Sequence, residues 1–221
     1  MKKKTGKLIV FEGIDGSGKG TQASLLAERL KREGYQVESL TFPQYGKKTA
    51  GLVEEYLAGT FGTAKEVGPY RASIFYAADR YDASRQLRAW LAEGKLVVTD
   101  RYMGSNIGHQ GGKIRSTKER AKFFEWLHDL EYNVFGIPKP DAQFLMSVNP
   151  TIASALRDSR KRAKDIHEAD ERHLRDAHNA YTAAAKQFAG HFTVVKCDSR
   201  GAMRKPDDIH EEVWGHVRKL I

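Results

Sequence analysis

A glycine-rich stretch near the start of the chain has residue types suited to binding phosphate. Gly13, Gly18 and Lys19 follow the apolar run of residues 8–11, and a helical pattern comes directly after them. This order fits the G-x-x-x-x-G-K-[ST] loop, whose glycines let backbone N–H groups surround phosphate oxygens while the lysine adds a point charge. The positive end of the following helix favours an anion at the same place. The stretch is therefore predicted to bind a nucleotide, rather than to form a plain turn, through Gly13, Ile14, Asp15, Gly16, Ser17, Gly18, Lys19, Gly20 and Thr21.

An acidic and a basic residue end a second apolar run. Asp100 and Arg101 come directly after residues 96–99, which have the pattern of a buried strand. Because α/β sheets bind ligands at the carboxyl ends of their strands, both side chains are expected near Lys19. Asp100, with Asp15 as a second candidate, is predicted to hold Mg²⁺ directly or through water. Arg101 is predicted to bind a phosphate through a bidentate contact of its guanidinium. The alternative for Asp100 is an ion pair with Arg101 or another base.

A candidate base site lies in the helical pattern of residues 70–91. Tyr76 and Arg80 are four residues apart, so they share one face of that helix. An aromatic ring stacked on a nucleobase, with a guanidinium reaching the carbonyl edge of the base, would form a recognition site. The alternative is that Tyr76 belongs to the hydrophobic core, as aromatic residues at helical spacing often do.

Residues 157–164 hold five cations in eight positions. A solvated helix face or a nucleic-acid patch would explain such a run. In a phosphoryl-transfer enzyme the same segment could instead close over the phosphates and supply charge in the transition state. The candidate side chains are Arg157, Arg160 and Arg162. His167, His173 and His178 follow at spacings that fit no zinc-ligand pattern, so a structural zinc site is not expected.

These residues must be positioned by alternating strands and helices. The expected strands cover residues 8–11, 36–41, 96–99, 142–148 and 192–196. Helical segments lie between them, while residues 104–112 are expected to be irregular or weakly helical. The alternation predicts an α/β fold with a parallel sheet and right-handed crossovers. Since no linker, repeat or low-complexity block interrupts the chain, residues 1–221 are expected to form a single domain.

Composition limits the partners without choosing one. The 221 residues include 37 Lys and Arg against 28 Asp and Glu, a balance that suits nucleic acid, an anionic membrane or a small polyanionic substrate. The single cysteine, Cys197, suits a reducing compartment. The apolar run after the leading lysines is too short for a signal peptide, and none is long enough to span a bilayer. We therefore expect a cytoplasmic protein that does not enter a membrane.

Taken together, the motifs resemble the thymidylate kinase family of P-loop nucleoside monophosphate kinases. Residues 11–19 are similar to that family's opening, and the Asp-Arg-Tyr sequence at 100–102 matches its D-R-[YH] signature. Residues 76–80 resemble its aromatic-x-x-x-Arg base site, and Ser105–Asn106 follow at the family's spacing. Residues 138–141 are similar to the segment before its fourth strand. The resemblance implies a P-loop NTPase fold, with a five-stranded parallel sheet flanked by helices and a small helical lid at about 155–168.

The resemblance also implies a role for each matching residue. Lys19 and the loop amides would bind ATP, Asp15 would lie near the acceptor sugar and phosphate, and Arg101 would hold the dTMP phosphate. Because Gly16 stands where some members carry an arginine, the lid arginines would supply that charge. The implied base and sugar contacts are Phe42, Tyr76, Arg80, Ser105, Asn106, His109 and Gln110. A homodimer is also implied, with Phe123, Phe124 and Trp126 on a helix that is either core or interface.

The sequence thus predicts transfer of the ATP γ-phosphoryl group to dTMP with Mg²⁺, a step of nucleotide biosynthesis. The alternatives are a kinase for AMP, UMP, CMP or dUMP, and an ATP-regulated nucleic-acid-binding protein. The chain has no long basic arm with interleaved aromatics, so a nucleic-acid partner is not expected. Gln44 stands where many members have an arginine for the acceptor phosphate, and Lys47, Lys48 or Arg71 is expected to compensate. Gly20 stands where a Ser or Thr hydroxyl normally meets Mg²⁺. The pair Gly20-Thr21 after Lys19 resembles the same positions of adenylate kinases more than those of most thymidylate kinases.

Overall fold

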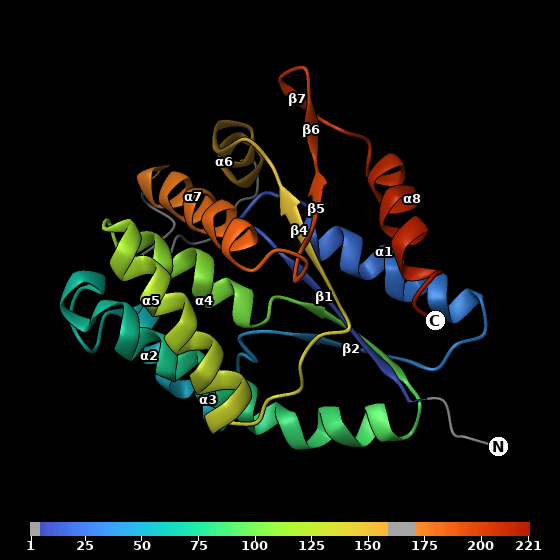
Figure 1. Ribbon diagram of the computed structural model, residues 1–221, viewed down its shortest axis with the longest axis horizontal. Coiled ribbons are helices and arrows are strands. Elements are labelled where there is room, and N and C mark those ends of the chain that lie inside the picture. The colour runs from blue at the N-terminus through green and yellow to red at the C-terminus, as the bar shows by residue number, and fades with distance from the viewer. Residues whose placement is uncertain (1–4, 159–170) are drawn as a thin grey trace.

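The computed structural model describes residues 5–158 and 171–221, and its centre is a five-stranded sheet (Figure 1). The strand order is β2-β3-β1-β4-β5, and every neighbouring pair is parallel. The strands are β1 (Lys7–Glu12), β2 (Val37–Thr41), β3 (Leu96–Asp100), β4 (Ala142–Ser147) and β5 (Thr193–Lys196). The predicted α/β class and five parallel strands are therefore confirmed.

Helices cover both faces of this sheet. They are α1 (Lys19–Arg32), α2 (Gly51–Ala58), α3 (Ala64–Ala92), α4 (Met103–His109), α5 (Thr117–His128), α6 (Pro150–Asp158), α7 (Glu171–Gln187) and α8 (Pro206–Val217). Helices α1 and α8 lie on one side of the sheet, and α3, α4 and α5 on the other (Figure 1). The shorter elements are the 3₁₀ turns η1 (Lys48–Ala50) and η2 (Gly111–Lys113), the π-helical turn η3 (Asp129–Val134), and a hairpin of β6 (Asp198–Ser199) and β7 (Ala202–Met203).

The central strand β1 shows why its sequence is continuously apolar. Successive side chains of a strand point to opposite faces of the sheet, and helices cover both faces here. Ile9 and Phe11 pack in the cluster that includes α1 and α8, whereas Leu8 and Val10 pack in the cluster that includes α3, α4 and α5. All four side chains are fully buried. This packing fixes β1, and therefore the loop that follows it.

The register of the sheet brings the two predicted motifs together. Strand β1 pairs with β3, so that Phe11 lies opposite Asp100. The backbone N–H of Arg101 donates to the carbonyl of Phe11 over 2.9 Å. The loop after β1 and the Asp100–Arg101 pair after β3 therefore leave the sheet side by side, as expected for neighbouring parallel strands.

Two helices differ from the sequence-based expectation. Residues 103–109 form the regular helix α4 rather than an irregular segment, although Gly104 and Gly108 lower its intrinsic helix propensity. Close packing explains this difference, because α4 lies against both β1 and α7 at its glycines. Helix α3 begins at Ala64, earlier than expected, because Thr63 and Glu66 form a capping box, and it is kinked at Gly68.

Gly108 permits the contact between α4 and α7. A Cβ atom at this position would lie 2.1 Å from the ring of Tyr181, which is buried and donates a hydrogen bond to Glu12. We expect Gly108→Ala to lower the free energy of unfolding by about 1–3 kcal/mol, the usual cost of overpacking. Urea unfolding followed by circular dichroism measures this change.

Gly51→Ala is the matched control for that measurement. Gly51 begins α2 with helical dihedral angles, and nothing lies within 4 Å of an added Cβ. Its replacement should be neutral or should stabilise the protein by up to about 1 kcal/mol. Equal unfolding free energies for the two variants would show that the α4–α7 contact does not require a glycine.

Candidate active site

The loop between β1 and α1 has the backbone shape that its glycines allow. Gly13, Gly16 and Gly18 all have positive φ values, of 146°, 84° and 84°. Residues with a side chain rarely adopt this region. At Gly16 a Cβ would also lie 2.2 Å from the carbonyl oxygen of Ala153 in α6. The first turn of α1, which begins at Lys19, contains no acidic residue, so its positive end is left for an anion.

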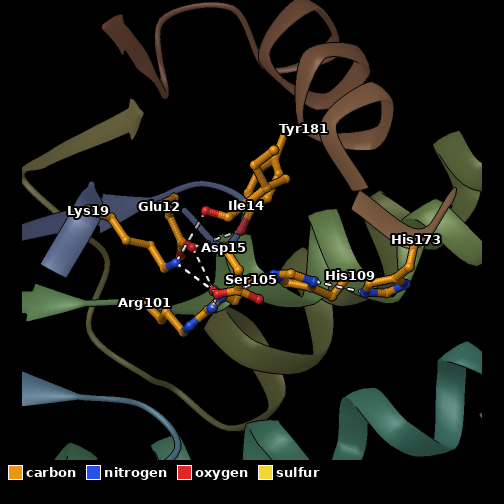
Figure 2. Close-up of polar contacts among 9 residues, drawn as sticks. All are labelled: Glu12, Ile14, Asp15, Lys19, Arg101, Ser105, His109, His173 and Tyr181. Atoms are coloured by element: carbon orange, nitrogen blue, oxygen red, sulfur yellow. Dashed lines mark hydrogen bonds and ion pairs between the residues drawn. The ribbon is translucent and has the colours of Figure 1, made fainter. Parts of the chain in front are cut away.

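Two cations, one at the start of α1 and one directly after β3, meet at one carboxylate, Asp15 (Figure 2). Lys19 Nζ lies 3.2 Å from Asp15 Oδ1 and 3.3 Å from the carbonyl oxygen of Ile14. Arg101 Nη2 donates to the same Asp15 oxygen. Burial opposes the ionisation of Asp15, yet the charges of Arg101 and Lys19 hold its pKa well below the usual range. In Lys19 the pKa is lowered, first by burial and then by the charge of Arg101.

The guanidinium of Arg101 is held on its other side by a histidine pair. Arg101 Nη1 lies 3.0 Å from His109 Nε2, and His109 Nδ1 lies 3.1 Å from His173 Nε2. Because a guanidinium only donates hydrogen bonds, His109 Nε2 must accept, so His109 carries its proton on Nδ1 and donates it to His173. Burial, followed by the nearby Arg101 charge, keeps the pKa of His109 well below its usual value. The imidazole of His109 is therefore neutral, and it orients Arg101.

Arg101 itself has an unusual backbone conformation. Its φ is 69°, in the left-handed region that residues with a side chain seldom occupy. Such conformations persist where surrounding contacts fix them, and they cluster at functional sites. Here Asp15 and His109 bind the side chain, with Ser105 Oγ a further 3.4 Å neighbour of Nη1. The site thus holds a fixed guanidinium facing the phosphate loop.

Glu12, which the sequence analysis did not single out, joins three elements beneath this site. Its buried carboxylate accepts hydrogen bonds from the backbone N–H of Tyr102 (2.7 Å), Ser105 Oγ (2.7 Å) and Tyr181 Oη (3.2 Å). Burial raises the pKa of Glu12, and the bond from Ser105 partly offsets that rise. The one signal in the sequence is a carboxylate that directly ends a buried apolar run.

Asp100 presents an oxygen suited to a cation. Its Oδ1 is buried and has no hydrogen-bond partner among the described residues. The ion pair considered as an alternative is likewise not found within the described part of the chain. A Cβ on Gly20 would lie 2.9 Å from Asp100 Oδ2, so the residue that replaces the usual hydroxyl directly adjoins this carboxylate. An unpartnered carboxylate oxygen beside the phosphate loop fits Mg²⁺, which prefers oxygen ligands.

The structure brings Arg80 and Asn106 together at the carboxylate of Glu131. Arg80 forms two hydrogen bonds to Glu131, Nε to Oε2 and Nη2 to Oε1, each of 2.6 Å. Asn106 Nδ2 lies 3.1 Å from Glu131 Oε1. Tyr76 is half-buried, and its ring meets that of Tyr56 edge-on with centroids 6.3 Å apart. Glu131, which the sequence analysis did not name, therefore links the two residues predicted to read the base.

The remaining predicted contacts are placed around this centre. Phe42 is buried and packs edge-on against Tyr102. Gln44 is held by Asp79, and Lys47 Nζ lies 2.7 Å from Gln44 Oε1, so one of the three candidate substitutes places a cation at that position. Arg71 instead donates to two carbonyl groups at the start of α3.

The expected lid falls only partly in the described chain. Arg157 belongs to α6, whereas Arg160 and Arg162 lie outside the described residues. Phe123 and Phe124 of α5 are buried in the core, and Trp126 is half-buried against Phe123.

Within residues 5–158 and 171–221, no group of three or more His, Cys, Asp or Glu side chains could hold a metal ion. No helix in those ranges is long and apolar enough to cross a membrane.

Lys113 was also missed by the sequence analysis. Its Nζ donates to Tyr56 Oη and to Gln110 Oε1, both at 2.7 Å. Burial lowers the pKa of Lys113 to about 8. It therefore joins a predicted substrate contact, Gln110, to the aromatic ring that packs on Tyr76.

The lowered pKa of Lys113 predicts that the free energy of unfolding depends on pH. Between about pH 8 and the usual lysine pKa near 10.5, the folded state has lost the proton that the unfolded state still binds. The unfolding free energy should therefore rise with pH across this window, by up to about 3 kcal/mol for this group. Lys113→Met should remove the rise, whereas Lys118→Met, at an exposed position, should keep it. Parallel pH profiles of the wild type and Lys113→Met would contradict the assignment.

Comparison with known proteins gives a consistent result. Residues 11–211 match the family model of thymidylate kinase. The thymidylate kinase of Plasmodium falciparum is 30% identical over 218 residues, covering 99% of this chain and 92% of that protein. Human thymidylate kinase is 28% identical over 168 residues, covering 76% of this chain and 70% of that protein. The solved structure of thymidylate kinase from Candida albicans, 21% identical, shares the fold with a TM-score of 0.75 over 97% of this chain and 92% of that one.

Proposed function

The chain belongs to the thymidylate kinase family, and on that premise we propose that it transfers the γ-phosphoryl group of ATP to dTMP, giving dTDP and ADP. The observation that carries the proposal is the contact of Lys19 and Arg101 with one Asp15 oxygen. Lys19 belongs to the phosphate loop, and Arg101 follows the neighbouring strand. The donor phosphates on one cation and the acceptor phosphate on the other would therefore meet between them.

Little covalent chemistry is required of the protein in this reaction. The acceptor is a phosphate oxygen that is already largely ionised at neutral pH, because the second pKa of a phosphate monoester is about 6. A general base is therefore not needed. The task is to align two anions and to neutralise the charge that spreads over the transferring group. Lys19 and the loop amides would hold the ATP phosphates, and Arg101, fixed by His109, would hold the dTMP phosphate.

The proposed metal is Mg²⁺. Asp100 Oδ1, with Asp15 as the second candidate, would hold it directly or through water. When bound, the ion supplies positive charge to the ATP phosphates. The neighbouring Gly20 leaves room for the Asp100 carboxylate where a larger residue would press on it.

The base and sugar contacts remain those expected from the family resemblance. Tyr76 would stack on thymine, while Arg80 and Asn106 would face its polar edge and Phe42 would pack nearby. Ser105, His109 and Gln110 would line the nucleoside, and Lys47 at Gln44 would assist with the acceptor phosphate. Arg71 is a weaker candidate for the acceptor phosphate, because its guanidinium already donates to two backbone carbonyl groups.

The domain organisation, the lid and the assembly of the protein are also proposed. Residues 1–221 would form one domain, with a lid at about 155–168 contributing Arg157, Arg160 and Arg162. The protein would act in the cytoplasm as a homodimer, without nucleic-acid partners. Exposed apolar side chains on α2 and α3 support a self-association surface, among them Leu52, Tyr70 and Ile74.

A panel of acceptors tests the proposed function. ADP release would be measured with ATP, Mg²⁺ and each of dTMP, dUMP, UMP, CMP and AMP. We expect the highest kcat/KM with dTMP. A preference for AMP or CMP would contradict the acceptor assignment, and steep salt-dependent binding of oligonucleotides without any phosphoryl transfer would favour the nucleic-acid alternative.

A further inference from the structure

A charged pair is completely enclosed beside the proposed base site. The Arg80 side chain is 1% exposed, and that of Glu131 is 0% exposed. Glu131 comes from η3, a π-helical turn directly after α5. Such turns are rare and frequently occur at functional sites. A buried ion pair is weak evidence for stability, because desolvation can cost as much as the attraction returns. Stability alone therefore does not explain why this pair is buried here.

Glu131 determines which atom of Asn106 remains available. The Asn106 amide has two N–H donors, and Nδ2 donates to Ser73 O and to Glu131 Oε1, each at 3.1 Å. This network also assigns the orientation of the amide, because both neighbours are acceptors. Asn106 Oδ1 is left free of these contacts. The side chain therefore offers a ligand an acceptor.

Glu131 fixes Arg80 in the same way. Nε and Nη2 are taken up by the two carboxylate oxygens, in a bidentate arrangement that sets the plane of the guanidinium. No hydrogen bond from Nη1 to another described residue is found. Nη1 can only donate. Since Arg80 Nη2 and Asn106 Nδ2 both donate to Glu131 Oε1, the two side chains are neighbours, one with a further donor and the other with a further acceptor.

We propose that Glu131 is a specificity-determining positioning residue, which fixes Arg80 as donor and Asn106 as acceptor and so selects a pyrimidine with a carbonyl at C4. Thymine and uracil present the O4 acceptor and the N3–H donor, which match this pair. Cytosine presents an N4 amino donor and a bare N3, which oppose it at both positions. This inference rests on the proposed function and deepens it, because it assigns the rejection of dCMP to a residue that does not touch the base.

The Glu131→Gln variant tests this polarity directly. Glutamine keeps the volume of the side chain but replaces one of the two acceptor oxygens with an NH₂ donor, so it can no longer accept from both Nε and Nη2 of Arg80. We expect the ratio of kcat/KM for dTMP to that for dCMP to fall about 10-fold or more, the size of one good paired contact. The fall should come mainly from a higher KM for dTMP, with the KM for ATP unchanged. Asp129→Asn, at an exposed position of the same turn, is the matched control and should keep the ratio.

A second variant covers the case in which Glu131→Gln does not fold. Arg80→Met combined with Glu131→Leu removes both charges, and such replacements of buried pairs are often tolerated. This double variant should fold, by circular dichroism and thermal unfolding, and should discriminate poorly between dTMP and dCMP. A folded variant of either kind that retains the wild-type ratio would overturn the inference alone. A wild-type protein that does not phosphorylate dTMP would instead overturn the proposed function, and the inference with it.

Discussion

Replacing Lys19 with methionine is expected to lower kcat for dTMP phosphorylation by about 10²–10³-fold, the usual effect of removing one charge-stabilising donor from a catalytic site. The ammonium group is buried at the phosphate loop, between the Ile14 carbonyl and Asp15. Methionine has a similar length but cannot stabilise the charge that develops on the transferring phosphoryl group. Steady-state kinetics over a range of ATP concentrations measures the loss.

The fold should survive this replacement. Burial lowers the pKa of Lys19, which means that its charge is costly to enclose, and Asp15 keeps its contact with Arg101. Thermal unfolding should therefore change little. Lys31→Met, at an exposed position late in α1, is the control and should leave kcat unchanged. Near-normal turnover in Lys19→Met would remove the central residue from the proposed site.

Arg101→Met is expected to reduce kcat/KM for dTMP by about 10²-fold, mostly by raising the KM for dTMP, because a charged partner of the acceptor phosphate is lost. The KM for ATP should change much less. Arg101→Lys should restore only part of the activity, since an ammonium is a single point charge and cannot reach Asp15, His109 and a phosphate at once. Initial rates with each substrate varied in turn measure the two KM values.

The control for Arg101 is Arg85→Met, an exposed arginine of α3. It should leave both KM values unchanged, which excludes a general effect of net charge. If an Arg101 variant raised the KM for ATP rather than the KM for dTMP, Arg101 would belong to the site of the ATP phosphates. Such a result would contradict the assignment of Arg101 to the acceptor.

The sheet and the phosphate loop could be predicted because their signals are local. An apolar run such as residues 8–11 is sufficient to indicate a buried strand, and the glycines before Lys19 indicate a curled loop. The meeting of Lys19 with Arg101 followed from parallel pairing alone. By contrast, α4 could not be predicted as a regular helix, because its glycines lower the helix propensity. The contacts that stabilise it come from β1 and α7, far away in the sequence.

The supporting residues of the site could not be read from the sequence in the same way. Arg80 was found by its four-residue spacing from Tyr76, but its partner Glu131 lies 51 positions away and belongs to a π-helical turn without a recognisable pattern. Lys113 and His109 also take their roles from long-range neighbours, Tyr56 and His173. Spacing within one helix predicts a shared face, whereas the choice of a buried partner depends on the packing of the whole domain.

The proposed reaction is a direct phosphoryl transfer between two phosphates, one held by Lys19 and the other by Arg101. The most direct measurement follows the label from [γ-³²P]ATP in the presence of Mg²⁺ and dTMP. We predict that the label appears in dTDP, in an amount equal to the ADP formed. Label found only in inorganic phosphate, with dTMP unchanged, would contradict direct transfer to the acceptor.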